Sequence, residues 1–384
     1  MDKLNPFEYG RELGLDELVD RREEMAAIDA AIRNRGKLFL IGPRRFGKTS
    51  VLSAAGEAAT RQGTVVLRFD AEKYESLELL AEALLTAAAR ALESRLDRAV
   101  SLISRAAGLL RPEARVDPEG FLSISIGGRS SRGALPVLTD ALDAVESLAA
   151  ESGRTVVVIL DEVQQVVVEH GITAERQLRS TVQQHRHLGY IFAGSDTRLL
   201  TEMTSDPDRP FYRMGERIFL GALPRDEFLE FLENGFAGSG FSCEPGVCAH
   251  LLDCAEEVPY NVQRLAHQAW EMLRAAPGNK VTRQVVDDAL ERLVRREDPA
   301  YTQIWTTLRR NQKTAIKAII TERGKGMMSA PVARKHHIST ASMQTALKQL
   351  EQASLIRSEK RDGHTWYRLI DPFFAAWLRL AQAS

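Results

Sequence analysis

One short loop carries the residue types best suited to chemistry in this sequence. The segment from Gly42 to Thr49 reads Gly-Pro-Arg-Arg-Phe-Gly-Lys-Thr and matches the pattern G-x-x-x-x-G-K-[ST]. In this pattern glycines let backbone N–H groups surround phosphates, the lysine reaches the β- and γ-phosphates, and the hydroxyl binds Mg²⁺. The sequence therefore predicts a site for ATP or ADP with Mg²⁺, formed by Gly42, Pro43, Arg44, Arg45, Phe46, Gly47, Lys48, Thr49 and Ser50.

Two carboxylates stand directly after an apolar run. Asp161 and Glu162 follow Thr155–Leu160, a run typical of a buried strand. Desolvating a carboxylate without a partner is costly, so such a pair at a strand end indicates a functional role. We expect Asp161 to hold Mg²⁺ together with Thr49, and Glu162 to activate the attacking water as a general base.

A further polar position follows the next apolar run. Ser195 comes shortly after Gly189–Ala193 and is expected to hydrogen-bond the γ-phosphate or the attacking water, with Asp196 as the second choice. The alternative is a turn that caps a helix, because Ser, Asp and Thr side chains all cap helices well.

These residues require a parallel sheet to position them. Short apolar runs without alternation, which suit strands buried on both faces, alternate with helical patterns through the first part of the chain. The pattern predicts an α/β P-loop NTPase fold. The expected strands are Lys37–Ile41, Thr64–Phe69, Thr155–Leu160, Gly189–Ala193 and Arg217–Leu220.

The region between the second and third expected strands is longer than one crossover helix needs. Glu75–Leu110 is rich in Ala and Leu and predicts a long helix, and Phe121–Ile126 predicts a strand. We interpret residues 72–152 as a helical insertion whose role the sequence does not indicate.

The C-terminal part has a different organisation. From Pro224 to about Arg296 the pattern predicts helices only, and Pro299 indicates a boundary. Three helices and a hairpin containing Asp362-Gly363 then predict a winged helix. The expected helices are Ala300–Thr321, Ala330–Lys335 and Ser339–Ala353, and the expected strands are Leu355–Glu359 and Thr365–Leu369. The predicted domains are therefore residues 1–222, 223–297 and 298–384.

Charge is distributed unevenly along the chain. The segment from Glu291 to Ser384 holds 17 Lys and Arg against 8 Asp and Glu, a net charge of +9, whereas the whole chain has −1 and the rest therefore −10. A basic end suggests double-stranded DNA as a partner. The expected DNA contacts are Gln344 and Lys348 in the major groove and Lys360 and Arg361 on phosphates. The alternative is a basic face that docks on the acidic part of the same chain.

Composition and the N-terminal residues indicate the expected cellular location of the protein. No apolar run reaches about 18 residues, so no membrane-spanning helix is expected. The N-terminus lacks the apolar core of a signal peptide, and we therefore expect a cytoplasmic protein. Cys243, Cys248 and Cys254 fit no common zinc spacing and are interpreted as small buried side chains in a helical segment.

Several motifs together resemble one family. Gly42–Leu52, Leu160–Gln164 and Phe192–Ser195 are similar to the phosphate loop, acidic motif and sensor strand of archaeal-type AAA+/STAND P-loop ATPases related to origin-recognition proteins. Further segments resemble the same family. Its N-terminal signature is similar to Asn5–Phe7, Gly10 and Val19–Met25, its lid motif to Val258–Leu265, and its ending to Asp371–Leu378.

The resemblance implies an AAA+-like core, a helical lid and a winged-helix domain. It places Arg21 near the nucleotide. It also implies that two arginines report on the γ-phosphate, namely Arg213, with Arg217 as second choice, and Arg264. The lid motif departs from the family pattern, because Val258 stands where Gly usually precedes Pro.

The leading functional hypothesis is an ATP-hydrolysing molecular switch. An alternative is an AAA+ ATPase that assembles on DNA, in which Arg213 acts on the nucleotide of a neighbouring copy. Two others are a DNA-binding regulator that holds nucleotide without turnover and a small-molecule kinase. A protein partner and self-assembly stay open at this stage.

Overall fold

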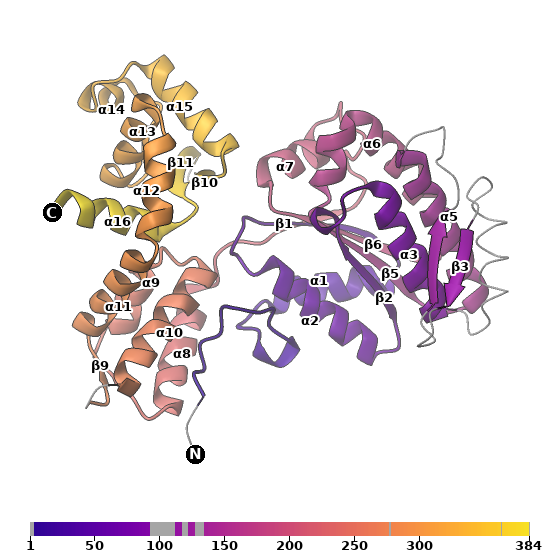
Figure 1. The fold of residues 1–384 in the computed structure, drawn as a ribbon, viewed down its shortest axis with the longest axis horizontal. Coiled ribbons are helices and arrows are strands. Elements are labelled where there is room, and N and C mark those ends of the chain that lie inside the picture. The colour runs from indigo at the N-terminus through magenta and orange to yellow at the C-terminus, as the bar shows by residue number, and fades with distance from the viewer. Residues whose placement is uncertain are drawn as a thin grey trace. The chain divides into compact units, whose positions relative to one another are not determined.

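The computed structural model describes residues 4–92, 112–116, 122–126, 134–275, 278–361 and 363–383. The chain divides into two compact units (Figure 1). The sheet unit comprises Glu12–Pro43 and Gly47–Gly221. The helical unit comprises Met1–Arg11, Arg44–Phe46 and Ala222–Ser384.

The sheet unit is built on five parallel strands in the order β2-β5-β6-β1-β7. The strands are β1 (Lys37–Ile41), β2 (Val65–Asp70), β5 (Val156–Asp161), β6 (Leu188–Gly194) and β7 (Glu216–Phe219). All five strands predicted from the sequence are confirmed, with ends that differ by one residue at most. The predicted α/β fold with a parallel sheet is likewise confirmed.

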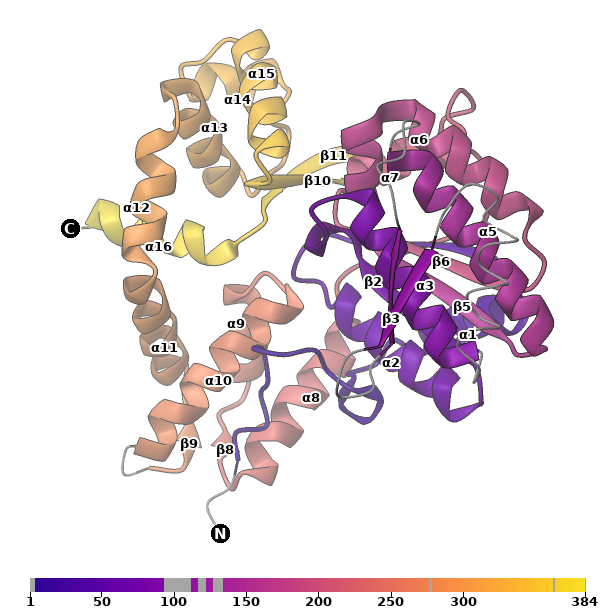
Figure 2. The ribbon, with the colours of Figure 1, turned by 45° about the vertical axis from the view of Figure 1, so that its right-hand side comes forward.

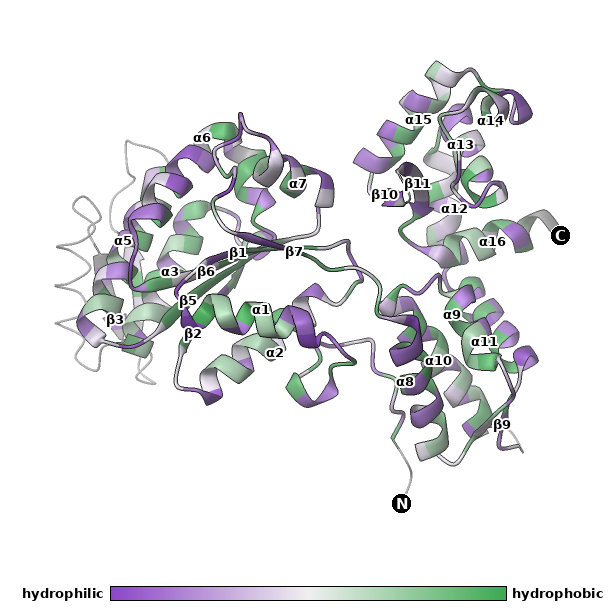
Figure 3. Cartoon of the chain, turned by 180° about the vertical axis from the view of Figure 1, so that it is seen from behind, coloured by the Kyte–Doolittle hydropathy of each residue, from purple (hydrophilic) through white to green (hydrophobic). Residues whose placement is uncertain are grey.

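The central strands are buried because helices cover both faces of the sheet. Every residue of β5 and β6 is buried, and both strands are green, the colour of hydrophobic residues, in Figure 3. Val156, Val158 and Leu160 pack into one apolar cluster with side chains of α3, α5 and α6. Burial on both faces explains why these strands are continuous apolar runs without alternation.

Helices connect the strands of the sheet unit. They are α1 (Arg22–Arg33), α2 (Lys48–Arg61), α3 (Leu77–Leu92), α5 (Ala134–Ser152), α6 (Gln164–Gln184) and α7 (Thr197–Ser205), with short 3₁₀ helices at Leu15–Glu17 and Ala71–Lys73. Of the long helix predicted over Glu75–Leu110, α3 confirms the first part, and the remainder lies outside the described residues. The strand predicted at Phe121–Ile126 is confirmed as β4 (Leu122–Ile126), which pairs antiparallel with β3 (Pro112–Val116).

The helical unit begins with α8 (Arg225–Gly238), α9 (Val247–Cys254), α10 (Pro259–Ala275) and α11 (Arg283–Arg296). The prediction of helices only was wrong, because β8 (Ser242–Cys243) pairs in parallel with β9 (Lys280–Val281). Segments this short carry too few residues to produce a recognisable strand pattern.

The end of the chain has the predicted hairpin, helices in the predicted regions, and a further helix at its end. The elements are α12 (Asp298–Thr307), α13 (Arg310–Thr321), α14 (Ala330–Lys335), α15 (Thr340–Gln352), β10 (Ile356–Arg361), β11 (His364–Leu369) and α16 (Pro372–Ala383). Figure 2 shows the β10–β11 hairpin extending from the helices. The single helix predicted over Ala300–Thr321 was wrong, because Leu308 and Arg309 have extended backbones that separate α12 from α13.

Candidate nucleotide site

The predicted loop lies at the carboxyl edge of the sheet. It follows β1 and leads into α2, so its glycines stand between a buried strand and a helix N-terminus. Strand β6 lies between β1 and β5, and the backbone N–H of Gly42 at the end of β1 donates to the carbonyl of Gly194 at the end of β6 (3.4 Å). The ends of all three strands therefore lie side by side at the carboxyl edge of the sheet, the edge at which open α/β sheets bind ligands.

Both glycines of the loop are required by its geometry. Gly47 has φ +84°, in the left-handed region, and precedes α2 without a side chain that caps its N–H groups. A Cβ added to Gly42 would lie 2.8 Å from Cβ of Leu220, closer than real contacts allow. The first turn of α2 thus keeps N–H donors that a phosphate could accept from, and the donor chemistry fits an anion.

Lys48 and Glu162 form an ion pair inside the site. Nζ of Lys48 lies 3.0 Å from Oε1 of Glu162, and the lysine side chain is only 6% exposed. The other carboxylate oxygen of Glu162 accepts hydrogen bonds from the backbone N–H (3.0 Å) and the hydroxyl (2.8 Å) of Ser195. The structure therefore brings together three residues that lie far apart in the sequence and that were predicted to act at one site.

The two neighbouring carboxylates have opposite electrostatic environments. Burial raises the pKa of Asp161 above its ordinary value, and Lys48 only partly offsets this effect. Burial acts in the same direction on Glu162, but Lys48 and the hydrogen bonds from Gln164 and Ser195 bring its pKa below the ordinary value. Glu162 is therefore ionised at neutral pH, as a group that orients or activates water must be.

The donor set beside the loop fits a hard divalent cation. Asp161 is buried at the end of β5, and the backbone N–H of Glu162 donates to its carboxylate oxygen Oδ1 (3.0 Å). Thr49 lies in the first turn of α2, at the same edge of the sheet. A carboxylate and a hydroxyl are oxygen ligands of the kind that Mg²⁺ uses beside phosphates.

Two residues near the site were not assigned a role from the sequence. Gln164 begins α6, and its side-chain N–H group donates to Glu162, while its Oε1 is buried without a partner. Asp70 ends β2 directly opposite Asp161 in the strand register. The signal for Gln164 was its position two residues after Glu162, and for Asp70 its position at the end of a buried strand.

Ser195 and Asp196 have different partners. Ser195 contacts Glu162, whereas Asp196 caps α7 by accepting from the backbone N–H of Leu199 (2.9 Å). The helix cap weighed for this segment is therefore made by Asp196.

Three other predicted site residues of the sheet unit have contacts of their own. Arg21 is buried and donates to the backbone carbonyl of Gly221 (2.7 Å). The hydroxyl of Ser50 accepts from the backbone N–H of Leu13 (3.1 Å). Arg213 is exposed, with φ +53°, and its guanidinium lies 5.1 Å from the ring centre of Tyr212.

Arg217, the second choice after Arg213 for an arginine that reports on the γ-phosphate, donates to the hydroxyl of Ser205.

The remaining predicted nucleotide contacts belong to the helical unit. Arg45 pairs with Asp371 (2.7 Å), and its guanidinium lies 5.1 Å from the ring centre of Tyr260. Phe46 is buried in this unit, and Arg44 is exposed. Arg264 forms an ion pair with Glu297. Their predicted roles toward the nucleotide stay predictions.

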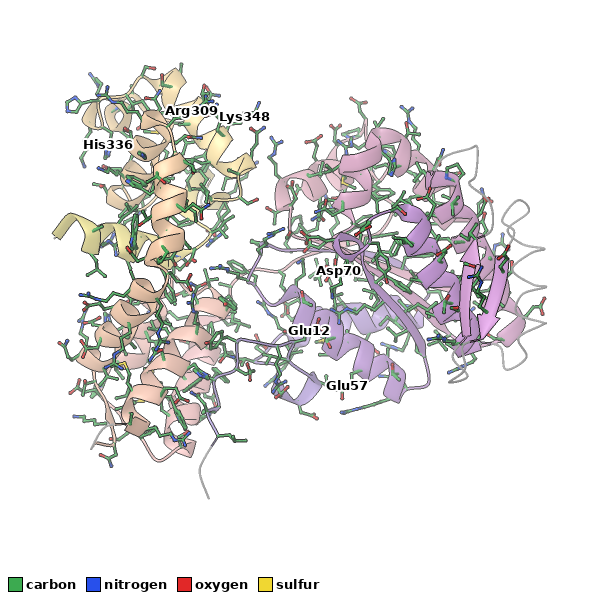
Figure 4. All side chains as sticks on the ribbon, in the orientation of Figure 1. Glu12, Glu57, Asp70, Arg309, His336 and Lys348 are labelled. Carbon is green, nitrogen blue, oxygen red and sulfur yellow. The ribbon has the colours of Figure 1, made fainter. Side chains whose placement is uncertain are left out.

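The winged helix presents the expected polar side chains. Gln344, Lys348 and Lys360 are exposed, while the side chain of Arg361 lies outside the described residues. The first residues of α13 and the face of α15 line an open groove, which Arg309, Arg310, Ser342, Thr345 and Gln349 border. Figure 4 labels Arg309 and Lys348, both exposed. The apolar side of α15 is buried, through Met343, Ala346, Leu347 and Leu350.

No helix among the described residues is both long and apolar enough to cross a membrane.

Comparison with protein families matches two parts of the chain. Residues 32–201 match the family described as "AAA domain", and residues 299–380 match the family described as "Probable winged helix domain". The first match contains the loop, both carboxylates and Ser195. A comparison with curated proteins gives no match.

Solved structures share the fold. A Walker-type ATPase of Pyrococcus abyssi is 18% identical, with 97% of this chain and 99% of that chain covered and a TM-score of 0.65. The ORC2 protein of Aeropyrum pernix, in ADPNP and ADP complexes, is 17% identical, with 99% and 98% covered and a TM-score of 0.55. At these identities the likeness concerns the fold alone. The loop, the sheet order and the two family matches together give the chain the fold of an AAA-type P-loop domain followed by a C-terminal winged-helix domain.

Proposed function

We propose that the protein binds ATP or ADP with Mg²⁺ and hydrolyses ATP. The observation that carries this proposal is the ion pair between Lys48 and Glu162, with Ser195 on the same carboxylate, directly behind the phosphate loop. A buried lysine and a largely buried glutamate, whose side chain is 13% exposed, are costly to maintain at this edge for stability alone. Together they provide a phosphate-binding cation and a base for water.

The chain's own groups divide the work of binding. The N–H groups of Gly42–Thr49 and the first turn of α2 receive the phosphates, and Lys48 pairs with the β- and γ-phosphates. Thr49 and Asp161 hold Mg²⁺, which supplies positive charge against the charge that develops on the phosphates.

Lys48 and Glu162 then act in sequence. When Lys48 turns to a phosphate, Glu162 loses its ion-pair partner but keeps the hydrogen bonds from Ser195. Its ionised carboxylate is then free to accept a proton from water that attacks the γ-phosphorus. Binding of ATP thus prepares the base, and hydrolysis with release of phosphate restores the ion pair.

We assign to arginines the role of responding to the bound nucleotide. Arg21, Arg213 and Arg264 are proposed to contact or report on the nucleotide, as in STAND-type switches, because a guanidinium is a permanently charged donor to phosphate. In the leading form residues 1–222 are the ATPase core, 223–297 a lid and 298–384 the winged helix. Arg213 acting on a second copy's nucleotide is the alternative.

Glu162→Gln tests hydrolysis separately from binding. The amide keeps the size of the side chain and cannot act as a base, so ATP turnover should fall by about 100-fold or more while ATP still binds. Steady-state phosphate release and equilibrium ATP binding measure the two quantities. Glu57→Gln, on a partly exposed carboxylate that pairs with Arg61 toward the far end of α2, is the control and should keep the wild-type turnover. Wild-type turnover in Glu162→Gln would refute the proposed base.

Duplex DNA is a second candidate ligand, for the winged helix. Its specific support is the exposed Gln344 and Lys348 on α15, the groove beside Arg309 and Arg310, and the net charge of +9 from Glu291 to Ser384. Lys360 on the hairpin adds a cation that can reach phosphates, and Arg361 is proposed to do the same.

A further inference from the structure

One side-chain cluster outside the nucleotide site has the composition of a metal site. His250 and Cys254 lie four residues apart on α9, so both project from the same face of that helix. Asp287 comes from α11, which packs against α9. One ligand atom of each residue lies within 4.8 Å of the other two. Imidazole, thiol and carboxylate groups from two helices therefore converge on one point.

The geometry centres on one nitrogen of the histidine. Nε2 of His250 lies 2.6 Å from Oδ1 of Asp287 and 3.6 Å from Sγ of Cys254, whereas its Nδ1 is farther from the sulfur, at 3.9 Å. Both partners thus face the same nitrogen. A cation that replaces the proton shared by Nε2 and Asp287 would meet all three groups.

The distances are close to those a tetrahedral ion needs. Ligand atoms about 2.0–2.3 Å from a tetrahedral Zn²⁺ lie about 3.3–3.7 Å from one another. The separation of Cys254 and His250 already suits this geometry. The hydrogen bond between His250 and Asp287 must open by less than about 1 Å, which small rotations of the Asp287 side chain can supply, because that side chain is 48% exposed.

The surroundings favour an added cation. The His250 side chain is only 17% exposed, and Cys254 is half-buried. The carboxylates of Asp287 and Asp253 add negative charge near the sulfur, which attracts a cation, whereas Arg283 and Arg379 act in the opposite direction.

We propose that His250, Cys254 and Asp287 bind one Zn²⁺-class divalent cation that links α9 to α11. Three protein ligands leave a fourth position for water. The interpretation of all three cysteines as small buried side chains in a helix therefore fails for Cys254, which is half-buried, and for Cys243, which lies in β8. The sequence gives no zinc spacing because the third ligand comes from a distant helix.

Cobalt substitution tests this site directly. Full-length protein, stripped with a chelator and free of nucleotide, is titrated with Co²⁺, and a sulfur-to-cobalt absorption band in the near ultraviolet reports the thiolate ligand. The wild type should bind one Co²⁺ with this band, and Zn²⁺ should remove it by displacement. Co²⁺ held by Thr49 and Asp161 would give no such band, because those ligands are oxygens.

Matched variants assign the ligands. Cys254→Ser should lose the band, and Asp287→Asn should weaken Co²⁺ binding by about tenfold or more. Cys243→Ser is the control, because Cys243 contacts Cys248 (3.7 Å between sulfurs) and not the proposed ligands, so its band should persist. Melting curves with chelator present should coincide for wild type and Cys254→Ser, and Zn²⁺ should raise the melting temperature of the wild type only. A wild type without the band, or a Cys254→Ser protein that keeps it, would overturn the proposal.

Discussion

At the scale of single residues, Lys48 acts on the two neighbouring carboxylates, Asp161 and Glu162, to different extents. Lys48 pairs directly with Glu162 and only partly offsets the burial of Asp161. The surroundings of Asp161 therefore disfavour its ionised form. Such a residue is retained for a ligand, since an unpaired buried charge does not stabilise a fold.

Asp161→Asn should therefore separate stability from function. Because the folded-state pKa of Asp161 is raised, its ionisation destabilises the folded protein, and this cost grows as pH rises through that pKa. At pH 7 without Mg²⁺, the variant should melt at or above the wild-type temperature, by on the order of 2 °C. The difference should shrink in acid, and Mg²⁺-dependent ATP hydrolysis should be lost. Calorimetry and phosphate release measure these effects.

The amide of the variant can still accept the hydrogen bond from the N–H of Glu162. Asp29→Asn, which removes an exposed carboxylate paired with Arg33, serves as the control and should change neither property. An Asp161→Asn protein that melts well below the wild type would contradict this interpretation of the buried carboxylate.

The sequence predicted which residues stand at the strand ends but not all their partners. The loop and the two acids follow apolar runs, and this local signal can be recognised in the sequence alone. The contacts of Glu162 with Lys48 and Ser195 depend on β6 lying between β1 and β5, and strand order is a property of the whole sheet. The hydrogen bond from Gln164 was missed for a similar reason, because its direction depends on how α6 leaves the strand end.

At the scale of elements, the proposed phosphate site depends on the backbone conformation of Gly47. Gly47 and Gly63 have nearly the same conformation, with φ of +84° and +86°, and a Cβ at either position would meet nothing within 4 Å. Gly47 directly precedes α2 at the predicted phosphate-binding site, whereas Gly63 follows the other end of that helix. The two positions form a matched pair with equal backbone strain.

Gly47→Ala and Gly63→Ala should each cost about 1 kcal/mol of unfolding free energy, because an L-residue pays to adopt the left-handed conformation. Only Gly47→Ala should also weaken ATP binding, by about tenfold or more, since relief of its strain moves the N–H groups that receive phosphate. Chemical denaturation and ATP titration measure the two effects. Equal ATP affinities in the two variants would count against a role of the loop backbone.

The helix predicted over Ala300–Thr321 shows where element-level patterns are insufficient. Its helical periodicity runs through the break, but Leu308 and Arg309 are extended, and Gln312 hydrogen-bonds the backbone N–H of Arg309 (2.8 Å) at the start of α13. This interaction begins a new helix without Gly or Pro at the break. Both break residues are compatible with helix, so local propensity could not indicate the end of α12.

At the scale of the whole molecule, the C-terminal segment and the rest of the chain differ in the sign of their net charge. The basic segment from Glu291 to Ser384 carries the winged helix, and the acidic remainder carries the phosphate loop. A basic surface that binds duplex phosphates releases counterions, so its affinity falls steeply with salt. The alternative, docking on the acidic part of the chain, predicts no binding of duplex DNA.

A salt titration of duplex DNA binding distinguishes these outcomes. Replacing both Lys348 and Lys360 by Ala should reduce the slope of log affinity against log salt by about 2, roughly one per lost phosphate contact. Lys317→Ala is the control, because this exposed lysine of α13 lies near the ring of Trp305 and outside the groove beside α15. Fluorescence anisotropy at several salt concentrations measures the slopes. A slope unchanged in the double variant would exclude these two contacts.

Calorimetric titration with Mg²⁺ and ATP measures whether the loop from Gly42 to Thr49 binds ATP through Lys48. The wild type should bind one ATP, and Lys48→Ala should bind at least about 100-fold more weakly, because the charge-assisted contact with the phosphates is lost and the carboxylate of Glu162 keeps no cation beside it. Lys37→Ala, at the opposite end of β1, should bind as the wild type does. Wild-type affinity in Lys48→Ala would contradict the account.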